Sequence, residues 1–190
     1  KDMSMQTNLS LSSQRTSNLA GIVDVPGDKS MSHRSLILGS LAIGTTKVTG
    51  LLEGADVLAT ADAMRALGVD ITRHEDGTRV IVGQGLHGLV APETALDLGN
   101  SGTGVRLLMG VVAGQAITAT FTGDASLSVR PMARITDPLQ HMGTRVASRD
   151  GGLLPVTITG QSEPMAISYE SPVASAQIKS AIFLAGLTAR

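Results

Sequence analysis

The chain repeats one succession of elements, and this duplication limits the folds available to it. Each copy has a β-forming run, a loop of small residues, an apolar helix, a strand ending in Thr-Gly, a second helix, a Gly and another strand. Equivalent glycines are 75, 73 and 75 residues apart in the pairs Gly27 and Gly102, Gly50 and Gly123, and Gly68 and Gly143. The agreement predicts duplicated βαβαββ units of an α/β (α+β) protein, with a period longer than those of common solenoids.

The two complete copies span about residues 22–94 and 95–165. Hydrophobic patterning in the first copy predicts helices at 32–41 and 56–67. It predicts strands at 22–25, 46–49, 69–73 and 79–82. The second predicts strands at 95–98, 118–122 and 144–147, with helices at 105–112 and ending at Met142.

A third copy begins at residue 166, with a strand at 166–169 and an apolar helix at 176–187. It stops at Arg190, before its return strand and second helix, and would leave edges and an apolar face uncovered. We therefore expect residues 21–190 to be one incomplete domain of a longer protein. Residues 1–20 are rich in Ser, Asn, Gln and Thr and predict a polar tail or a surface strand.

Composition narrows the classes of function. Of 190 residues, 42% are apolar, enough for one sizeable core of Leu, Ile, Val, Ala and Met, and 2% are aromatic. The net charge of −1 gives no basic field for nucleic acid or an anionic membrane. With no Cys and four scattered His, neither a disulfide framework nor a metal site is predicted. The absence of Cys suits a reducing cytoplasm, and no apolar stretch approaches the roughly 20 residues that cross a bilayer.

Two segments resemble nucleotide-binding motifs but lack the required context. Residues 83–88 match GxGxxG after a predicted strand, yet no helix follows and no acid lies about 20 residues further on. A glycine-rich turn explains them better. Residues 26–30 read Pro-Gly-Asp-Lys-Ser, which is not a Walker A loop because Lys29 follows an Asp.

The start of the first helix is instead a candidate anion site. Lys29 and Ser30 lie at its N-terminus, and Arg34 lies four residues after Ser30 on the same helical face. With the backbone N–H groups and the helix dipole, these side chains can hold a phosphate or a carboxylate. The alternative is that Ser30 or Ser32 only caps the helix and the basic side chains are solvated.

The second copy carries a comparable loop. Asn100, Gly102 and Thr103 lie at the corresponding turn, and Arg106 lies one turn inside the helix. Two such N-termini at one repeat position favour a ligand with more than one acidic group. Arg130, directed by the following Pro, adds a cation, although a surface Arg is the plain alternative.

The third loop offers uncharged donors. Ser175 and Gln177 suit a sugar-like hydroxyl or a phosphate, and Lys179 follows them. Ser175 could merely cap its helix. The repeat register places this loop with the other two.

Several segments, in order, resemble the 5-enolpyruvylshikimate-3-phosphate synthase family, the enolpyruvyl transferases of the shikimate pathway. The resemblance covers about residues 21–190. It is carried by residues 24–34 (DVPGDKSMSHR), 98–104 (LGNSGTG), 123–124 (GD), 130–132 (RPM) and 174–177 (ASAQ).

This resemblance implies a two-domain enolpyruvyl transferase fold, with three βαβαββ units in each domain. The chain would supply most of the N-terminal domain, and the partner domain, the C-terminal half, is absent from it. The implied reaction transfers the enolpyruvyl group of phosphoenolpyruvate to the 5-hydroxyl of shikimate 3-phosphate and releases phosphate, in chorismate and aromatic amino acid biosynthesis. The resemblance implies no metal or organic cofactor.

The resemblance also implies roles for single residues. Lys29, as a catalytic residue, would contact phosphoenolpyruvate. Ser30 and Arg34 would hold shikimate. Gly102 and Arg130 would meet the phosphate of phosphoenolpyruvate. Glyphosate occupies the phosphoenolpyruvate site in this family, and a methyl group at the position of Gly102 gives tolerance, so the Gly found here predicts sensitivity.

The remaining expected site residues shape or extend these subsites. Asn100 and Thr103 would shape the second loop, and Ser175 and Gln177 would bind shikimate 3-phosphate. Ala176 stands where many members carry a further phosphate-contacting Ser. The Ala-Ser-Ala-Gln form resembles the second, divergent class of these enzymes.

Three alternatives stay open. The sibling transferase that acts on UDP-N-acetylglucosamine typically has Asn after the loop Lys and a mobile Cys, whereas this chain has Ser30 and no Cys. RNA 3'-phosphate cyclases share the repeated architecture, but the charge and aromatic content disfavour RNA. An inactive anion-binding fragment is the third. The acidic proton-transfer groups of the family lie in the other domain, so we expect the 190 residues alone to bind weakly and not to turn over.

Overall fold

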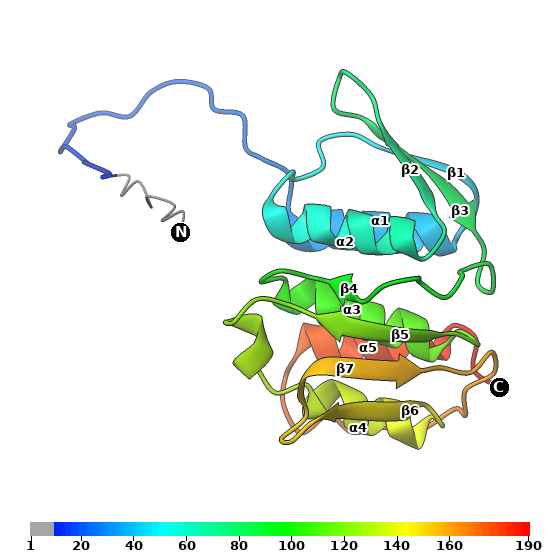
Figure 1. Ribbon diagram of the computed structural model, residues 1–190. Coiled ribbons are helices and arrows are strands. Elements are labelled where there is room, and N and C mark those ends of the chain that lie inside the picture. Colours follow the sequence, from blue (N-terminus) through cyan, green and yellow to red (C-terminus); the bar gives the residue numbers. More distant parts are fainter. Residues whose placement is uncertain (1–9) are drawn as a thin grey trace, which may run out of the picture.

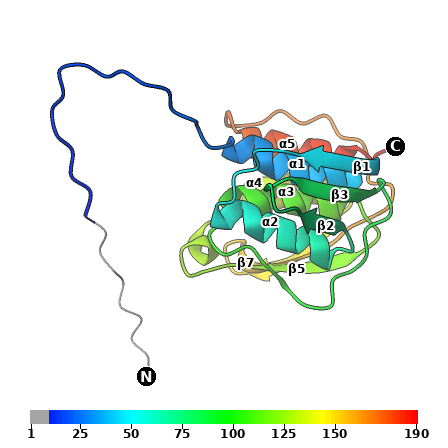
Figure 2. The same ribbon diagram turned by 90° about the horizontal axis from the view of Figure 1, so that it is seen from above.

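The structure is a computed structural model that describes residues 10–190 (Figure 1). Residues 10–25 form an extended arm that stands away from the body in both views (Figures 1 and 2), and residues 1–9 of the predicted tail lie outside the described part. The strand predicted at residues 22–25 is absent, and Ile22 is 100% exposed. That prediction was wrong because a strand requires a neighbouring strand, and the described residues place none beside the arm.

The first unit joins two helices to a three-stranded antiparallel sheet. In chain order it contains α1 (Lys29–Leu41), β1 (Ile43–Val48), α2 (Ala55–Ala66), β2 (Asp70–Arg73) and β3 (Arg79–Gln84). The strand order is β1-β3-β2. Ile81 on the central strand lies opposite Thr46 on one side and Ile71 on the other, and it is fully buried.

The second unit is complete. In chain order it contains β4 (Leu96–Asp97), α3 (Gly102–Ala113), β5 (Thr118–Thr122), the short 3-10 helix η1 (Leu127–Val129), α4 (Ala133–His141), β6 (Arg145–Arg149) and β7 (Leu153–Thr159). The strand order is β4-β5-β7-β6, with β4 parallel to β5 and the other pairs antiparallel. The two sheets correspond strand by strand, and β4 takes the place that residues 22–25 leave empty in the first unit.

The third copy contributes helix α5 (Ala176–Gly186), close to the predicted 176–187. The strand predicted at 166–169 does not form. The backbone N–H of Ala166 donates to the carbonyl of Arg190 at 3.1 Å, and that of Met165 donates to Met142 at 2.9 Å. The prediction was wrong because these bonds go to a chain end and a helix cap, not to a continuous strand.

Helix α3 is the centre of the core. It packs against α1, α2, α4 and α5, and its side chains Leu107, Leu108 and Met109 are fully buried. As predicted, Leu, Ile, Val, Ala and Met dominate the interior, and Phe121 is the aromatic residue buried among them. Across residues 10–190, no helix is both long enough and apolar enough to span a bilayer.

Helices α3 and α5 approach each other closely and run parallel. A Cβ on Gly110 would lie 2.3 Å from the carbonyl oxygen of Ala181, and one on Gly114 would lie 2.8 Å from Oγ1 of Thr188. The Thr188 hydroxyl donates to the Gly114 carbonyl at 3.0 Å. Because glycine has no side chain, the two backbones can touch here. Since the helices run parallel, their N-terminal ends lie at the same end of the molecule.

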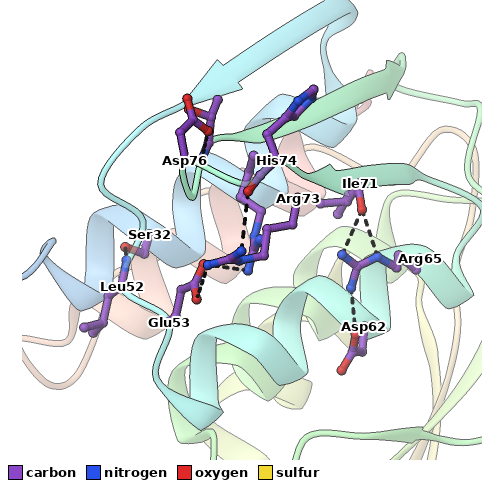
Figure 3. Close-up of polar contacts among 11 residues, drawn as sticks. Ser32, Leu52, Glu53, Asp62, Arg65, Ile71, Arg73, His74 and Asp76 are labelled. Atoms are coloured by element: carbon purple, nitrogen blue, oxygen red, sulfur yellow. Dashed lines mark hydrogen bonds and ion pairs between the residues drawn. The ribbon is translucent and has the colours of Figure 1, made fainter.

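Polar contacts fix α2 against the hairpin of the first unit (Figure 3). The Arg65 guanidinium donates to the carbonyl of Ile71 from Nε at 3.1 Å and from Nη2 at 2.8 Å. The Glu53 carboxylate accepts from Arg73 at 2.8 Å and pairs with the buried Arg79 at 3.0 Å. Arg65 lies in the last turn of α2 and Glu53 lies just before its first turn, so these contacts hold both ends of the helix against the hairpin.

Candidate active site

The N-terminal ends of α1, α3 and α5 gather at one end of the molecule, on the left in Figure 1. Nη2 of Arg34 on α1 donates to the hydroxyl of Ser180 on α5 at 2.8 Å. Nε2 of Gln177 on α5 donates to the hydroxyl of Thr103 on α3 at 3.0 Å, and its Oε1 accepts from Arg106 at 3.1 Å. The three predicted loops therefore meet, as the repeat register predicted.

Helix α1 begins at Lys29, three residues before the predicted start at residue 32. The carboxylate of Asp28 accepts from the backbone N–H of Met31 at 2.7 Å and caps the helix, so Lys29 and Ser30 belong to its first turn. A Cβ on Gly27 would lie 2.0 Å from the carbonyl oxygen of Gly50. Only glycine fits there, and the loop is pressed onto the segment that follows β1.

The ammonium of Lys29 pairs with the carboxylate of Asp56 in the first turn of α2. The side chain of Lys29 is half exposed, whereas that of Asp56 is 24% exposed. Asp56 was not among the predicted site residues. No spacing rule could have found it, because the two positions are 27 residues apart on different helices.

Arg34 is held at both ends of its guanidinium. Nη1 donates to the carbonyl of Ser30 at 3.1 Å, and Nη2 donates to Ser180. Ser180 was also not predicted, although it lies in the same helical segment as Ser175 and Gln177. These contacts direct Arg34 across the gap between α1 and α5.

The second loop orients Arg130 through Asn100. The Asn100 carbonyl accepts from Nη2 of Arg130, and its amide donates to the carboxylate of Asp124 at 2.8 Å. Arg130 also donates to Ser126 at 2.9 Å. A hydrogen bond from the backbone N–H of Leu127, and then the one from Asn100, lowers the pKa of Asp124, which therefore stays ionised. Asp124 thus fixes which end of the Asn100 amide faces Arg130.

Two guanidinium groups converge on Gly102 at the start of α3. A Cβ there would lie 3.0 Å from Nη1 of Arg106 and 3.1 Å from Nη1 of Arg130. Ser101 caps the helix and accepts from the backbone N–H of Gly104 at 3.1 Å. The positive end of α3 and two cations therefore surround one point.

The electrostatics of this point favour an anion. Burial, and then the positive charges of Arg130 and Arg134, lower the pKa of Arg106. A bound phosphate or carboxylate would relieve this repulsion between like charges. Arg134, an exposed residue of α4, was not predicted to contribute.

A cavity of about 440 Å³ opens beside these cations. It is lined by both charged and uncharged polar groups, namely Arg106, Arg134, Ser175 and Gln177, together with apolar residues of α4 and α5. Ser175 caps α5, since its hydroxyl accepts from the N–H of Ile178 at 3.4 Å. Ala176 begins α5 and is exposed. The volume lies within the range of small-molecule sites in proteins.

A family model described as EPSP synthase (3-phosphoshikimate 1-carboxyvinyltransferase) matches residues 13–190. The chain belongs to the EPSP synthase family. It is 60% identical over 177 residues to the 3-phosphoshikimate 1-carboxyvinyltransferase of Paramagnetospirillum magneticum, covering 93% of this chain and 40% of the relative. To that of a Ruegeria species it is 57% identical over 183 residues, with coverages of 96% and 41%.

Solved EPSP synthases share the fold. The EPSP synthase structure from Acinetobacter baumannii superposes with a TM-score of 0.85 at 52% identity, covering 89% of this chain and 38% of that one. The chain therefore spans about 40% of the length of its EPSP synthase relatives. The family inferred from the motifs at residues 24–34 and 98–104 and the repeated α/β fold inferred from the spacing of equivalent elements are confirmed.

Proposed function

We propose that this chain supplies one substrate-binding half of an enzyme that transfers the enolpyruvyl group of phosphoenolpyruvate to the 5-hydroxyl of shikimate 3-phosphate. The products are 5-enolpyruvylshikimate 3-phosphate and inorganic phosphate. The observation that supports this most is the convergence of Arg106 and Arg130 on the backbone of Gly102, at the positive end of α3. Family membership and the names of its relatives point to the same reaction.

The reaction needs fixed positive groups more than it needs a nucleophilic side chain. Protonation of C3 of phosphoenolpyruvate develops positive charge at C2, where the 5-hydroxyl of shikimate 3-phosphate attacks, forms a C–O bond and gives up its proton. The tetrahedral adduct then breaks the bond between C2 and the oxygen of the phosphate group, which leaves as inorganic phosphate after taking up a proton, while C3 loses a proton. Cations and backbone N–H groups that are already in place stabilise the anionic groups throughout. In this proposal the proton-transfer carboxylates come from the other half of the enzyme.

The phosphoenolpyruvate end of the site lies along α1 and α3. In this proposal Lys29 contacts phosphoenolpyruvate, and Asp56 aims its ammonium. The backbone of Gly102 and the guanidinium of Arg130 hold the phosphate, with Asn100 setting the orientation of Arg130. Lys29, the backbone N–H of Gly102 and Arg130 each donate a charge-assisted hydrogen bond to an oxyanion of the substrate. Asp56 and Asn100 only orient these donors.

The shikimate 3-phosphate end lies along α1 and α5. Ser30 and Arg34 bind the hydroxyl and carboxylate groups of the ring, and Ser175 and Gln177 bind from α5 into the cavity of about 440 Å³. Thr103 supports Gln177 from α3. Ala176 adds no hydroxyl, so the free N–H groups in the first turn of α5 take over that phosphate contact.

The test is an amide NMR titration of the isotope-labelled 190-residue chain with shikimate 3-phosphate, with unphosphorylated shikimate as the control ligand. We expect shifts confined to residues 29–34 and 175–179, and a weaker response to shikimate. A second titration with phosphoenolpyruvate should move the signals of Gly102 and Arg130. A well-dispersed spectrum that responds to neither ligand at millimolar concentration would contradict a preformed half-site in this chain.

A further inference from the structure

A buried histidine lies directly beneath the predicted catalytic lysine. His33 follows Lys29 by one turn of α1 and is fully buried. Its Nδ1 lies 2.8 Å from Oγ1 of Thr60, which follows Asp56 by one turn of α2. Two rungs therefore join α1 to α2: the ion pair of Lys29 and Asp56 near the surface, and the pair of His33 and Thr60 one turn deeper.

The contacts of Thr60 and His33 indicate which group donates and which accepts in the hydrogen bond between them. The hydroxyl of Thr60 donates to the backbone carbonyl of Asp56 at 3.3 Å, which leaves its oxygen available to accept from a protonated Nδ1 of His33. Nε2 of His33 is buried and has no hydrogen-bond partner among the described residues. A bare ring nitrogen there costs less than a buried N–H without an acceptor. Both observations place the ring proton on Nδ1.

The Thr60 hydroxyl also touches the second loop. A Cβ on Gly104 would lie 2.6 Å from Oγ1 of Thr60 and 2.7 Å from Oγ of Ser101, which caps α3. The hydroxyl is thus enclosed where α1, α2 and α3 meet. A change in the hydrogen bonding of this hydroxyl would therefore alter the packing at the N-terminal ends of both α1 and α3.

We propose that His33 is a positioning residue, which acts through Thr60 and the backbone of Asp56 to hold Asp56 where it orients Lys29. The hydrogen bonds run from His33 to Thr60 and from Thr60 to Asp56, and the carboxylate of Asp56 completes the path to the ammonium. The value of this arrangement for catalysis rests on the proposed function. The arrangement itself is testable without any ligand.

The surroundings of His33 favour a neutral imidazole ring at pH 7. Burial, and then the positive charge of Lys29, lowers the pKa of His33 to about 4. Asp56 opposes this shift and Arg34 adds to it. The turn of α3 that meets Thr60, residues 101–104, carries no charged side chain. At neutral pH the ring therefore keeps a single proton, available to Thr60.

The first test reads the position of that proton. Long-range ¹H–¹⁵N correlation spectra of the ¹⁵N-labelled chain at pH 7 distinguish a protonated ring nitrogen from a bare one. We expect Nδ1 of His33 to be protonated and Nε2 bare. A proton on Nε2 would overturn the proposal, and since no ligand is present, that result would leave the proposed function untouched.

The second test reads the effect on Lys29. In Asp56→Asn the ion pair is lost, and the ¹³Cε and ¹Hε signals of Lys29 define the unpaired state. We expect Thr60→Val to move these signals more than halfway toward that state and Thr60→Ser to leave them in place. Unchanged Lys29 signals in a folded Thr60→Val chain would refute the positioning role.

A second pair of variants covers the case in which Thr60→Val does not fold. His33→Asn keeps a polar group near the position of Nδ1, whereas His33→Leu removes it. We expect the Lys29 signals to be retained in His33→Asn and shifted in His33→Leu. Equal signals in the two variants would show that the hydrogen bond does not orient Lys29.

Discussion

At the scale of single residues, Gly102 leaves room for an anion between two guanidinium groups. In Gly102→Ala the methyl group would lie 3.0 Å from Arg106 and 3.1 Å from Arg130, so both side chains must move. We expect phosphoenolpyruvate and glyphosate to bind this variant about tenfold more weakly, a cost of about 1.4 kcal/mol. Chemical-shift titration of the chain measures both affinities.

The control for this variant is Gly186→Ala on α5. A Cβ at Gly186 would meet no atom within 4 Å. We expect both affinities to stay the same in Gly186→Ala. If Gly102→Ala also binds both ligands as the unmodified chain does, Gly102 does not border the anion site.

The lowered pKa of His33 predicts how the free energy of unfolding depends on pH. Its pKa falls from 6.5 to about 4 on folding, so between these values the unfolded chain binds more protons than the folded one. Stability from this group is complete above about pH 6.5 and is lost as pH falls toward 4, by about 3 kcal/mol in total. Urea unfolding at pH 7 and pH 4.5 measures the difference.

The matched variant for the pH experiment is His33→Asn, which cannot titrate. Asp124 and other carboxylates also weaken the fold in acid, so the informative quantity is the difference in pH dependence between the two chains. We expect the variant to lose less stability than the unmodified chain over this range. Identical losses would show that His33 titrates no differently in the folded state.

At the scale of elements, the contact between α3 and α5 is the most sensitive. In Gly110→Ala the new methyl group would lie 2.3 Å from the carbonyl oxygen of Ala181, which is backbone and cannot turn aside. We expect the free energy of unfolding to fall by about 1–3 kcal/mol, as for other overpacked cores. Denaturant titration measures it, and Gly186→Ala, expected to be neutral or slightly stabilising, is the control.

The same variant tests how α5 is placed at the site. If α5 moves away from α3, Gln177 loses its bonds to Thr103 and Arg106. We expect the side-chain amide signals of Gln177 to shift in Gly110→Ala and to stay in place in Gly186→Ala. A Gly110→Ala chain of full stability with unshifted Gln177 signals would contradict the close packing.

Most predicted element boundaries lie within two residues of the observed ones, and the larger differences include β1, which begins at Ile43 and not at residue 46. The strand 118–122 was predicted to the residue. Helices α1 and α3 begin three residues before the expected positions, because Asp28 and Ser101 cap them at loops that the glycines had suggested were longer. The strands expected at 22–25 and 166–169 are absent, since each needs a partner strand that local sequence does not reveal.

At the scale of the whole molecule, we predict that the 190 residues alone do not catalyse the reaction. The chain spans about 40% of the length of its relatives. The mechanism that we propose assigns the proton-transfer groups to the other half of the enzyme. Incubation with both substrates should release no phosphate above background, while a full-length relative, as the positive control, should release it. Measurable phosphate release by the pure chain would contradict the assignment of the proton-transfer groups to the other half of the enzyme.

The family, the repeated units and the loops that carry the candidate site were predicted from the sequence, because repeated glycines and the motif at residues 24–34 are local patterns. What only the tertiary structure decided is how these residues are paired. Asp56 meets Lys29 across 27 residues, and Ser180 meets Arg34 across 146. Such contacts depend on the distance between neighbouring parallel helices. That distance is set by the packing of side chains in the core and not by the polar residues that form the contacts.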